Sequence, residues 1–234
     1  REWFAYQTLE KEVRVMTTVL PIVSDLKSPA MEARHWDQLM RVAKHGFEKG
    51  PDTTLSDVLR LRLQDRIAEV KVVIEVASKE ARVEKKLQVI ESVWGSQMLK
   101  LRAYKDSGIK ILQSPDEVVE YLEEHQLQLQ SMIGMGRFVD FFRERVMKWK
   151  NVLSIVEVNL KLWLHVQHLW VSLESIFLNA ADIRSQLPDD TKRFEDIDDE
   201  FRIFMRAIAT NPMVVDVCTE DGREEILRDM VGEL

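Results

Sequence analysis

The residues with the best spacing for chemistry are Glu32 and His35. A Glu-x-x-His pair places a carboxylate and an imidazole on one face of a helix, as in the di-iron helical bundles. Such a centre needs two copies of the pair and two further carboxylates from facing helices, and the sequence holds one copy. We therefore expect His35 to have a structural role beside Trp36, and we predict no metal site.

Two further patterns resemble catalytic or metal-binding sites only in part. His165 and His168 stand three residues apart and could share a cation, but no third ligand accompanies them, which favours two single, partly buried histidines. Ser24 and Lys27 fit a bare Ser-x-x-Lys pattern without the companion motifs of the enzymes that use it. Neither pattern predicts an active site.

The single cysteine, Cys218, lies near Asp216 and Glu220, whose charges disfavour a thiolate. The sequence also lacks the glycine-rich segments that hold nucleotide phosphates. We therefore predict no catalytic residue, no cofactor-binding residue and no enzyme activity in this chain.

The strongest regular pattern is a set of large apolar residues that recur every seven positions between Arg137 and Leu187, where the chain has no Gly or Pro. We call this set the aromatic seam; its members are Phe142, Trp149, Val156, Trp163, Trp170 and Phe177. A seven-residue repeat keeps one face of a helix against a partner helix. Within a predicted helix from 138 to 178, the seam from Phe142 to Phe177 is about 52 Å long, which predicts stiff, bundled helices.

Composition favours an all-α fold. The 234 residues are 45% hydrophobic and 31% charged, and 8 Gly and 6 Pro are few enough for long helices. The net charge is -7, and the basic clusters at 79–86 and 143–150 are interleaved with Glu, which excludes nucleic acid as the expected partner. One cysteine and no apolar run near 18 residues predict a soluble protein of a reducing compartment, and the ends suggest a piece of a longer chain.

The N-terminal part predicts short helices. A stripe at Leu9, Val13, Met16 and Leu20 indicates a helix that ends before Pro21, where a second one begins. Ser28 is the expected N-cap of the next helix, with Pro29 in its first turn, and Thr54 is the expected cap of a short helix that reaches Leu61. A long helix follows to Trp94, with residues 70–77 buried and Lys79, Glu80, Arg82, Lys85 and Lys86 toward solvent.

After Trp94 the apolar pattern alternates on both sides of a Ser-Gly turn, which predicts a β-hairpin at 97–112. Gly134 and Gly136 predict a break before the seam helix or a place where two backbones approach closely. The expected fold is all-α, with elongated multi-helix bundles and one small β-hairpin. We divide it into a first bundle (1–95), the hairpin (96–113) and a second bundle (114–234).

Several segments, in this order, resemble axonemal dynein heavy chains. They are SPAMEARHW at 28–36, ASKE at 77–80, EKKL at 84–87, WLHVQ at 163–167, LESIF at 173–177, ADIR at 181–184 and QLP at 186–188. The residues that match the motifs best are Arg34, His35, Trp36, Gln167, Gln186, Leu187 and Pro188. The resemblance covers about the whole chain.

The resemblance implies the N-terminal part of the dynein linker, a non-catalytic lever that lies across a ring of AAA+ modules and transmits the ATP-driven power stroke. ATP and Mg would bind in the ring of the parent chain and not in these residues. The implied partners are that ring, other dynein heavy, intermediate or light chains and, through the rest of the parent, microtubules, with no nucleic acid and no membrane. The implied place is the cytoplasmic cytoskeleton, in the axoneme of a cilium or flagellum.

The hairpin would be the projection that touches the ring, through Lys100, Arg102, Tyr104 and Lys105. Two alternatives remain at this point. A helical tether or scaffold would hold partners apart without a motor role, and it has no use for a hairpin. A helical metalloenzyme would need bound iron or zinc.

Overall fold

The computed structural model describes residues 3–44, 54–177 and 180–234. It divides into two compact units, each described here by itself. Unit 1 comprises residues 1–85 and 137–141, and unit 2 comprises residues 86–136 and 142–234. The division along the long helix falls at Lys85, ten residues before the end of the first bundle as predicted from sequence.

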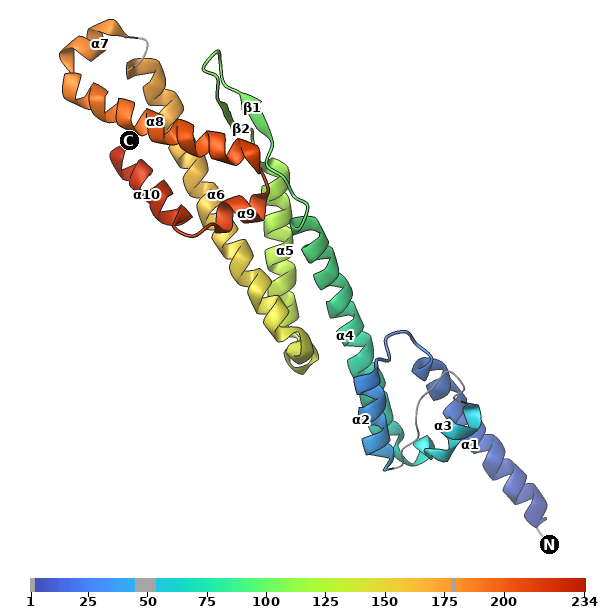
Figure 1. Ribbon diagram of the computed structural model, residues 1–234. Helices are drawn as coiled ribbons and strands as arrows, with labels where there is room; N and C mark the ends of the chain where they lie inside the picture. The colour runs from blue at the N-terminus through green and yellow to red at the C-terminus, as the bar shows by residue number, and fades with distance from the viewer. Residues whose placement is uncertain (1–2, 45–53, 178–179) are drawn as a thin grey trace. The chain divides into compact units, whose positions relative to one another are not determined.

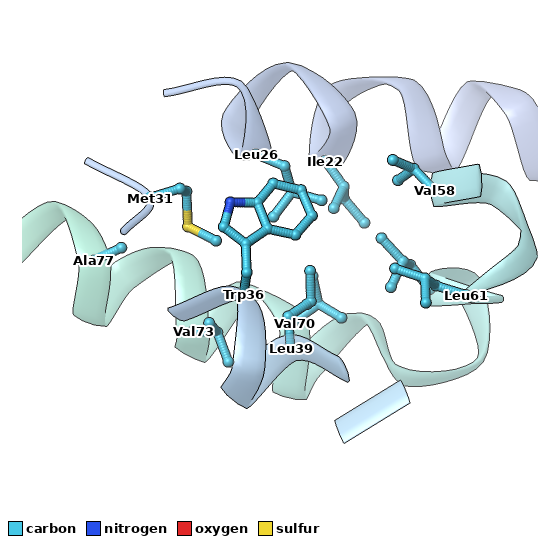
Figure 2. Packing of buried hydrophobic residues seen from close by; sticks show 11 residues of the cluster. Ile22, Leu26, Met31, Trp36, Leu39, Val58, Leu61, Val70, Val73 and Ala77 are labelled. Atoms are coloured by element: carbon cyan, nitrogen blue, oxygen red, sulfur yellow. The ribbon is translucent and has the colours of Figure 1, made fainter. Parts of the chain in front are cut away.

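Unit 1 packs its helices around one apolar cluster. Its elements are α1 (Phe4–Leu26), α2 (Ala33–Ala43), α3 (Leu55–Arg60), the 3₁₀ helix η1 (Leu63–Arg66) and the first part of α4 (Ile67–Trp94). Figure 2 shows the cluster, in which the Trp36 indole of α2 lies among Ile22 and Leu26 of α1 and Met31. Val70, Val73 and Ala77 of α4 are buried in the same cluster, as the stripe at 70–77 predicts.

The break predicted at Pro21 is wrong, because α1 continues through it to Leu26. Proline removes one helical hydrogen bond, a cost that packing can offset. Val19, Ile22 and Leu26 lie on one helical face and are all buried, so burial on both sides of Pro21 keeps the helix continuous.

The predicted cap at Ser28 is also wrong, since α2 begins at Ala33 with Glu32 as its N-cap. The Glu32 side chain accepts from the third helical N–H, and the His35 ring accepts from the Glu32 N–H at 3.1 Å. This reciprocal pair satisfies two N–H groups that a helix start leaves free, which the lone Ser28 hydroxyl cannot do. The cap at Thr54 is confirmed: its Oγ1 accepts from the Asp57 N–H.

Unit 2 is organised around its longest helix, α6 (Arg143–Phe177). Figure 1 shows α6 between α5 (Asp116–Gly134) and α10 (Arg223–Glu233), with α8 (Pro188–Thr210) crossing it. The short helices α7 (Ala181–Gln186) and α9 (Val214–Thr219) also contact α6. This helix is therefore covered from several sides.

The predicted hairpin is present. β1 (Leu101–Ala103) pairs antiparallel with β2 (Lys110–Leu112), with Arg102 opposite Ile111. Gly108 in the turn has φ of +73°, a conformation that glycine adopts without steric cost. An all-α fold with one small hairpin is thereby confirmed for the part of the chain that the structure describes.

The break predicted between α5 and the seam helix also lies where expected. α5 ends at Gly134, Gly136 has φ of +63°, and the 3₁₀ helix η2 (Gly136–Phe142) precedes α6. The seam helix therefore starts at Arg143 and not at residue 138, and Phe142 is the last residue of η2.

Candidate functional site at the hairpin junction

The hairpin is attached to α6 through Gln167. The Leu112 N–H donates to Gln167 Oε1 at 2.8 Å, and Gln167 Nε2 donates to the Leu112 carbonyl at 2.9 Å. A strand at a sheet edge leaves such backbone groups unpaired. One amide side chain thus replaces a neighbouring strand and fixes the position of β2 on the helix.

Seven residues further along α6, Glu174 holds the turn side of the hairpin. Tyr104 Oη donates to Glu174 Oε2 at 3.1 Å, and Lys105 Nζ lies 2.5 Å from the same oxygen. The hydrogen bond with Glu174 raises the pKa of Lys105. The Tyr104 ring packs tilted against Trp170, with 5.1 Å between ring centroids. Glu174 is buried, and these two donors offset the cost of burying its carboxylate.

A second carboxylate, Asp198 of α8, links the same region to a third element. Trp170 Nε1 donates to Asp198 Oδ1 at 2.9 Å, and Arg202 Nε donates to Oδ2 at 2.7 Å. Arg202 Nη1 also donates to the Ser107 carbonyl in the turn, at 3.2 Å. The hairpin is therefore fixed by side chains from two helices, and such a connected network resists local opening.

The four hairpin residues that were expected to touch the ring of AAA+ modules differ in solvent exposure. Tyr104 is 8% exposed and anchors the hairpin, so its ring does not face solvent. Lys100 is exposed and lies 2.6 Å from Glu117, which raises the pKa of Lys100. Lys105 is also exposed and bound to Glu174. Arg102 is exposed, and the described residues provide no ion-pair partner for it.

The Arg-His-Trp segment forms a separate polar cluster in unit 1. His35 Nδ1 accepts from the Glu32 backbone, so Nε2 carries the proton and donates to Glu80 Oε2 at 3.0 Å. Arg34 Nε donates to the same oxygen at 2.9 Å, and its guanidinium lies 3.9 Å from the centroid of the Phe141 ring. The Glu-x-x-His pair thus caps a helix. The expected solvent exposure of Glu80 is wrong, because the Arg34 guanidinium and the neutral His35 ring both donate to its carboxylate and offset the cost of burying it.

Three other motif residues connect two helices in unit 2. Gln186 is the last residue of α7, Leu187 joins the helices and is 44% exposed, and Pro188 is the first residue of α8. Proline fits the first helical position because it has no N–H to leave unpaired. The structure does not bring these residues to the hairpin junction.

Most of the aromatic seam is buried in unit 2. Phe142, Val156, Trp163 and Trp170 are each at most 1% exposed, while Trp149 and Phe177 are half-buried. The rings of α6 meet rings of α8 in successive layers, through the pairs Trp163–Phe204, Trp170–Phe201 and Phe177–Phe194. Trp149 Nε1 donates to Glu91 at 3.1 Å.

The remaining candidates for chemistry are not gathered into a site. His165 and His168 are both exposed, and the residues that the structure describes contain no group of three His, Cys, Asp or Glu placed to hold a metal. Burial raises the pKa of the Cys218 thiol to about 12. Within the described ranges, no helix has the length and apolar character that crossing a membrane requires.

Sequence reasoning missed the buried carboxylates Glu80, Glu174 and Asp198. Gln167 and Glu174 are seven residues apart, the same interval as the aromatic seam, on a helix face that is otherwise apolar. Polar residues that follow an apolar repeat predict buried hydrogen bonds. That signal could have identified Glu174, whereas the partners from distant elements could not be read from spacing.

Comparison with known proteins covers the whole chain. The family described as "Dynein heavy chain, N-terminal region 2" matches residues 1–234. The chain is 39% identical to the "Dynein beta chain, flagellar outer arm" of Chlamydomonas reinhardtii and 37% identical to the "Dynein beta chain, ciliary" of Tripneustes gratilla. It is 36% identical to "Dynein axonemal heavy chain 9" of Homo sapiens. Each alignment covers 100% of this chain and about 5% of the relative.

Proposed function

Because this chain belongs to the dynein heavy chain family, as its N-terminal region, we propose that it is the N-terminal part of the linker of a dynein motor. In this role it is a non-catalytic mechanical element. It docks across the AAA+ ring of the same heavy chain and transmits the power stroke, while ATP and Mg²⁺ bind in the ring.

The attachment of the hairpin is the observation that carries this proposal. A projection transmits force only if it does not bend away from the body that holds it. Gln167 and Glu174 hold the hairpin on α6, and Arg202 holds its turn on α8. A helical tether, the alternative function, has no use for a projection fixed in this way.

The surface proposed to meet the ring is the charged side of the hairpin. Residues 100–110 contain Lys100, Arg102, Lys105 and Lys110 against Asp106 alone, in a chain of net charge -7. Arg102 and Lys110 are exposed, and none of the described residues forms an ion pair with either. Opposite charges across an interface favour the docked state and speed its formation.

The wider setting follows from the relatives and is part of the same proposal. The parent protein works in the axoneme of a cilium or flagellum, as the names of the flagellar and ciliary relatives suggest. Its partners are other dynein chains and, through the rest of the heavy chain, microtubules.

The test is a double charge reversal, Arg102→Glu with Lys110→Glu, in the full heavy chain. Microtubule gliding velocity should fall at least about twofold, because the docked state loses its charge complementarity. The matched control is Lys192→Glu with Arg206→Glu, which makes the same charge change at two exposed positions of α8. Wild-type velocity in the hairpin variant, with wild-type thermal stability, would favour the tether.

A further inference from the structure

Helix α1 presents an apolar stripe to solvent. Tyr6, Leu9, Val13, Met16 and Leu20 follow one another at intervals of 3, 4, 3 and 4, and we call them the open seam. They are 66%, 60%, 55%, 40% and 50% exposed, respectively. Intervals of this kind are those of the a and d positions of a heptad, which place all five side chains along one helical face. The open seam is about 21 Å long.

The orientation of this face is set by the C-terminal half of α1. Val19, Ile22 and Leu26 are buried in unit 1 and fix the helix on its other side. Figure 1 shows the N-terminal half of α1 extending beyond α3. The open seam therefore cannot turn inward without exposing Val19 and pulling Ile22 and Leu26 out of the apolar cluster.

A groove runs along the open seam. Its volume is about 870 Å³, and its lining includes Leu9, Val13, Met16 and Leu20 from α1. Leu59 of α3 and Gln64 of η1 form part of the same lining. A groove with one helical wall that carries a heptad repeat suits a second helix, because only a helix presents side chains at the matching interval.

The residues beside the open seam determine the charge of such a helix. With Tyr6, Val13 and Leu20 at a, the flanking e and g positions carry Glu10 and Glu12 as their only charged side chains in the described part of α1. Arg14 lies 2.6 Å from Glu10, and Glu12 has no ion-pair partner among the described residues. The flanks of the open seam are therefore acidic.

We propose that the open seam is a docking site for an amphipathic α-helix with apolar residues at a and d and Lys or Arg at e and g. A second copy of α1 fits less well, because it brings two more glutamates to the same seam. The inference does not depend on the linker function, since it rests on the spacing, exposure and charge of α1 alone.

The test uses three synthetic 21-residue peptides and the whole 234-residue chain. The first peptide has Leu at a and d and Lys at e and g, the second has Glu at e and g, and the third keeps Lys but has Ser at a and d. Fluorescence anisotropy of labelled peptides measures binding. We expect the first peptide to bind at least about fivefold more tightly than the second and the third not to bind.

Variants of the chain separate docking from general charge attraction. Val13→Asp should weaken binding of the first peptide at least about tenfold, because it places a charge in the apolar contact. Leu127→Asp, at a position of α5 that is 68% exposed, is the matched control and should leave binding unchanged. Glu10→Lys with Glu12→Lys should reverse the preference between the first two peptides.

Two results would overturn the proposal. One is equal binding of the Lys and Glu peptides, or binding that Val13→Asp does not weaken. The other is a dimer of the chain in sedimentation velocity that Val13→Asp dissociates, since a second copy would then occupy the open seam.

Discussion

Helices α1 and α6 both carry a heptad-type apolar stripe, yet one stripe is open and the other is covered. On α6, Trp163 and Trp170 are 1% and 0% exposed. On α1, Leu9 and Val13 are 60% and 55% exposed. The same periodicity therefore coexists with opposite burial.

The two stripes differ in burial because α8 of unit 2 covers the stripe of α6, while the described residues of unit 1 leave the stripe of α1 exposed. Phe201 and Phe204 of α8 place rings against the aromatic seam, at centroid distances of 4.7 and 5.3 Å. Large rings at such distances bury much apolar area and favour a single packing arrangement. A heptad thus indicates that a helix needs a partner, and only the structure shows whether the described chain contains it.

The largest effect should come from Trp163→Ala. Loss of a fully buried indole leaves a cavity, and we expect a decrease of about 3 to 5 kcal/mol in the free energy of unfolding. Leu9→Ala on the open seam should change it by less than about 0.5 kcal/mol, because an exposed side chain loses little on truncation. Urea denaturation of both variants measures the difference.

Trp163→Phe is the control for the size of the ring. The described residues offer no hydrogen-bond partner to Trp163 Nε1, so a phenyl ring loses no polar contact there. Trp163→Phe should therefore lower the free energy of unfolding by less than Trp163→Ala does. Equal, small losses for Trp163→Ala and Leu9→Ala would show that the aromatic seam is no more important for stability than the open one.

A second prediction concerns the polar contact that α6 makes with the hairpin. Gln167→Ala leaves the buried Leu112 without partners for its N–H and C=O, which should cost about 1 to 3 kcal/mol. Hydrogen exchange should show lower protection of the Leu112 amide. Gln128→Ala, which removes only an exposed contact with Glu124, is the matched control. Unchanged protection of Leu112 would contradict the role of Gln167 as a substitute strand.

Sequence alone identified the all-α class, the hairpin and the break at Gly136. Of the six positions of the aromatic seam, four are buried and two, Trp149 and Phe177, are half-buried. These features depend on local conformation and on periodicity, which neighbouring residues determine. It failed at Pro21 and Glu80, where residues distant in sequence decide the outcome. Buried neighbours keep α1 continuous, and Arg34 and His35 make a buried carboxylate tolerable. The hairpin was predicted, but its contacts with α6 and α8 were not.

The cover of α6 includes Cys218, whose carbonyl accepts from Asn159 Nδ2 at 2.7 Å. Burial raises the pKa of its thiol to about 12, while nearby Arg223 opposes this effect. Above pH 9 the unfolded chain binds fewer protons than the folded one, so the free energy of unfolding decreases as the pH rises. The contribution of the buried thiol to this free energy is therefore complete below pH 9. It should decline by about 1 kcal/mol between pH 9 and 10.

Cys218→Ala separates this effect from other alkaline titrations. Its free energy of unfolding should fall less between pH 8 and 10 than that of the wild type. An identical pH dependence in the two proteins would mean that the thiol is not protected by this cover. Leu9→Ala should keep the wild-type dependence, since the open seam has no part in burying the thiol.

The smallest effect should come from His125 of α5, another helix that covers α6. Trp94 Nε1 donates to His125 Nδ1 at 2.9 Å, so this nitrogen must be unprotonated in the folded chain. Burial lowers the pKa of His125, and the charge of Glu124 opposes that change in part. The unfolded chain therefore binds more protons as pH falls below about 6.5, and stability should decrease from there until the folded imidazole is protonated.

Thermal unfolding between pH 7.5 and 5 should show a smaller decrease in His125→Gln, whose amide oxygen can still accept from Trp94, than in the wild type. An equal decrease in both proteins would mean that protonation of a group other than His125 causes the loss of stability. The buried contacts around α6 would then be no more sensitive to acid than the exposed stripe of α1.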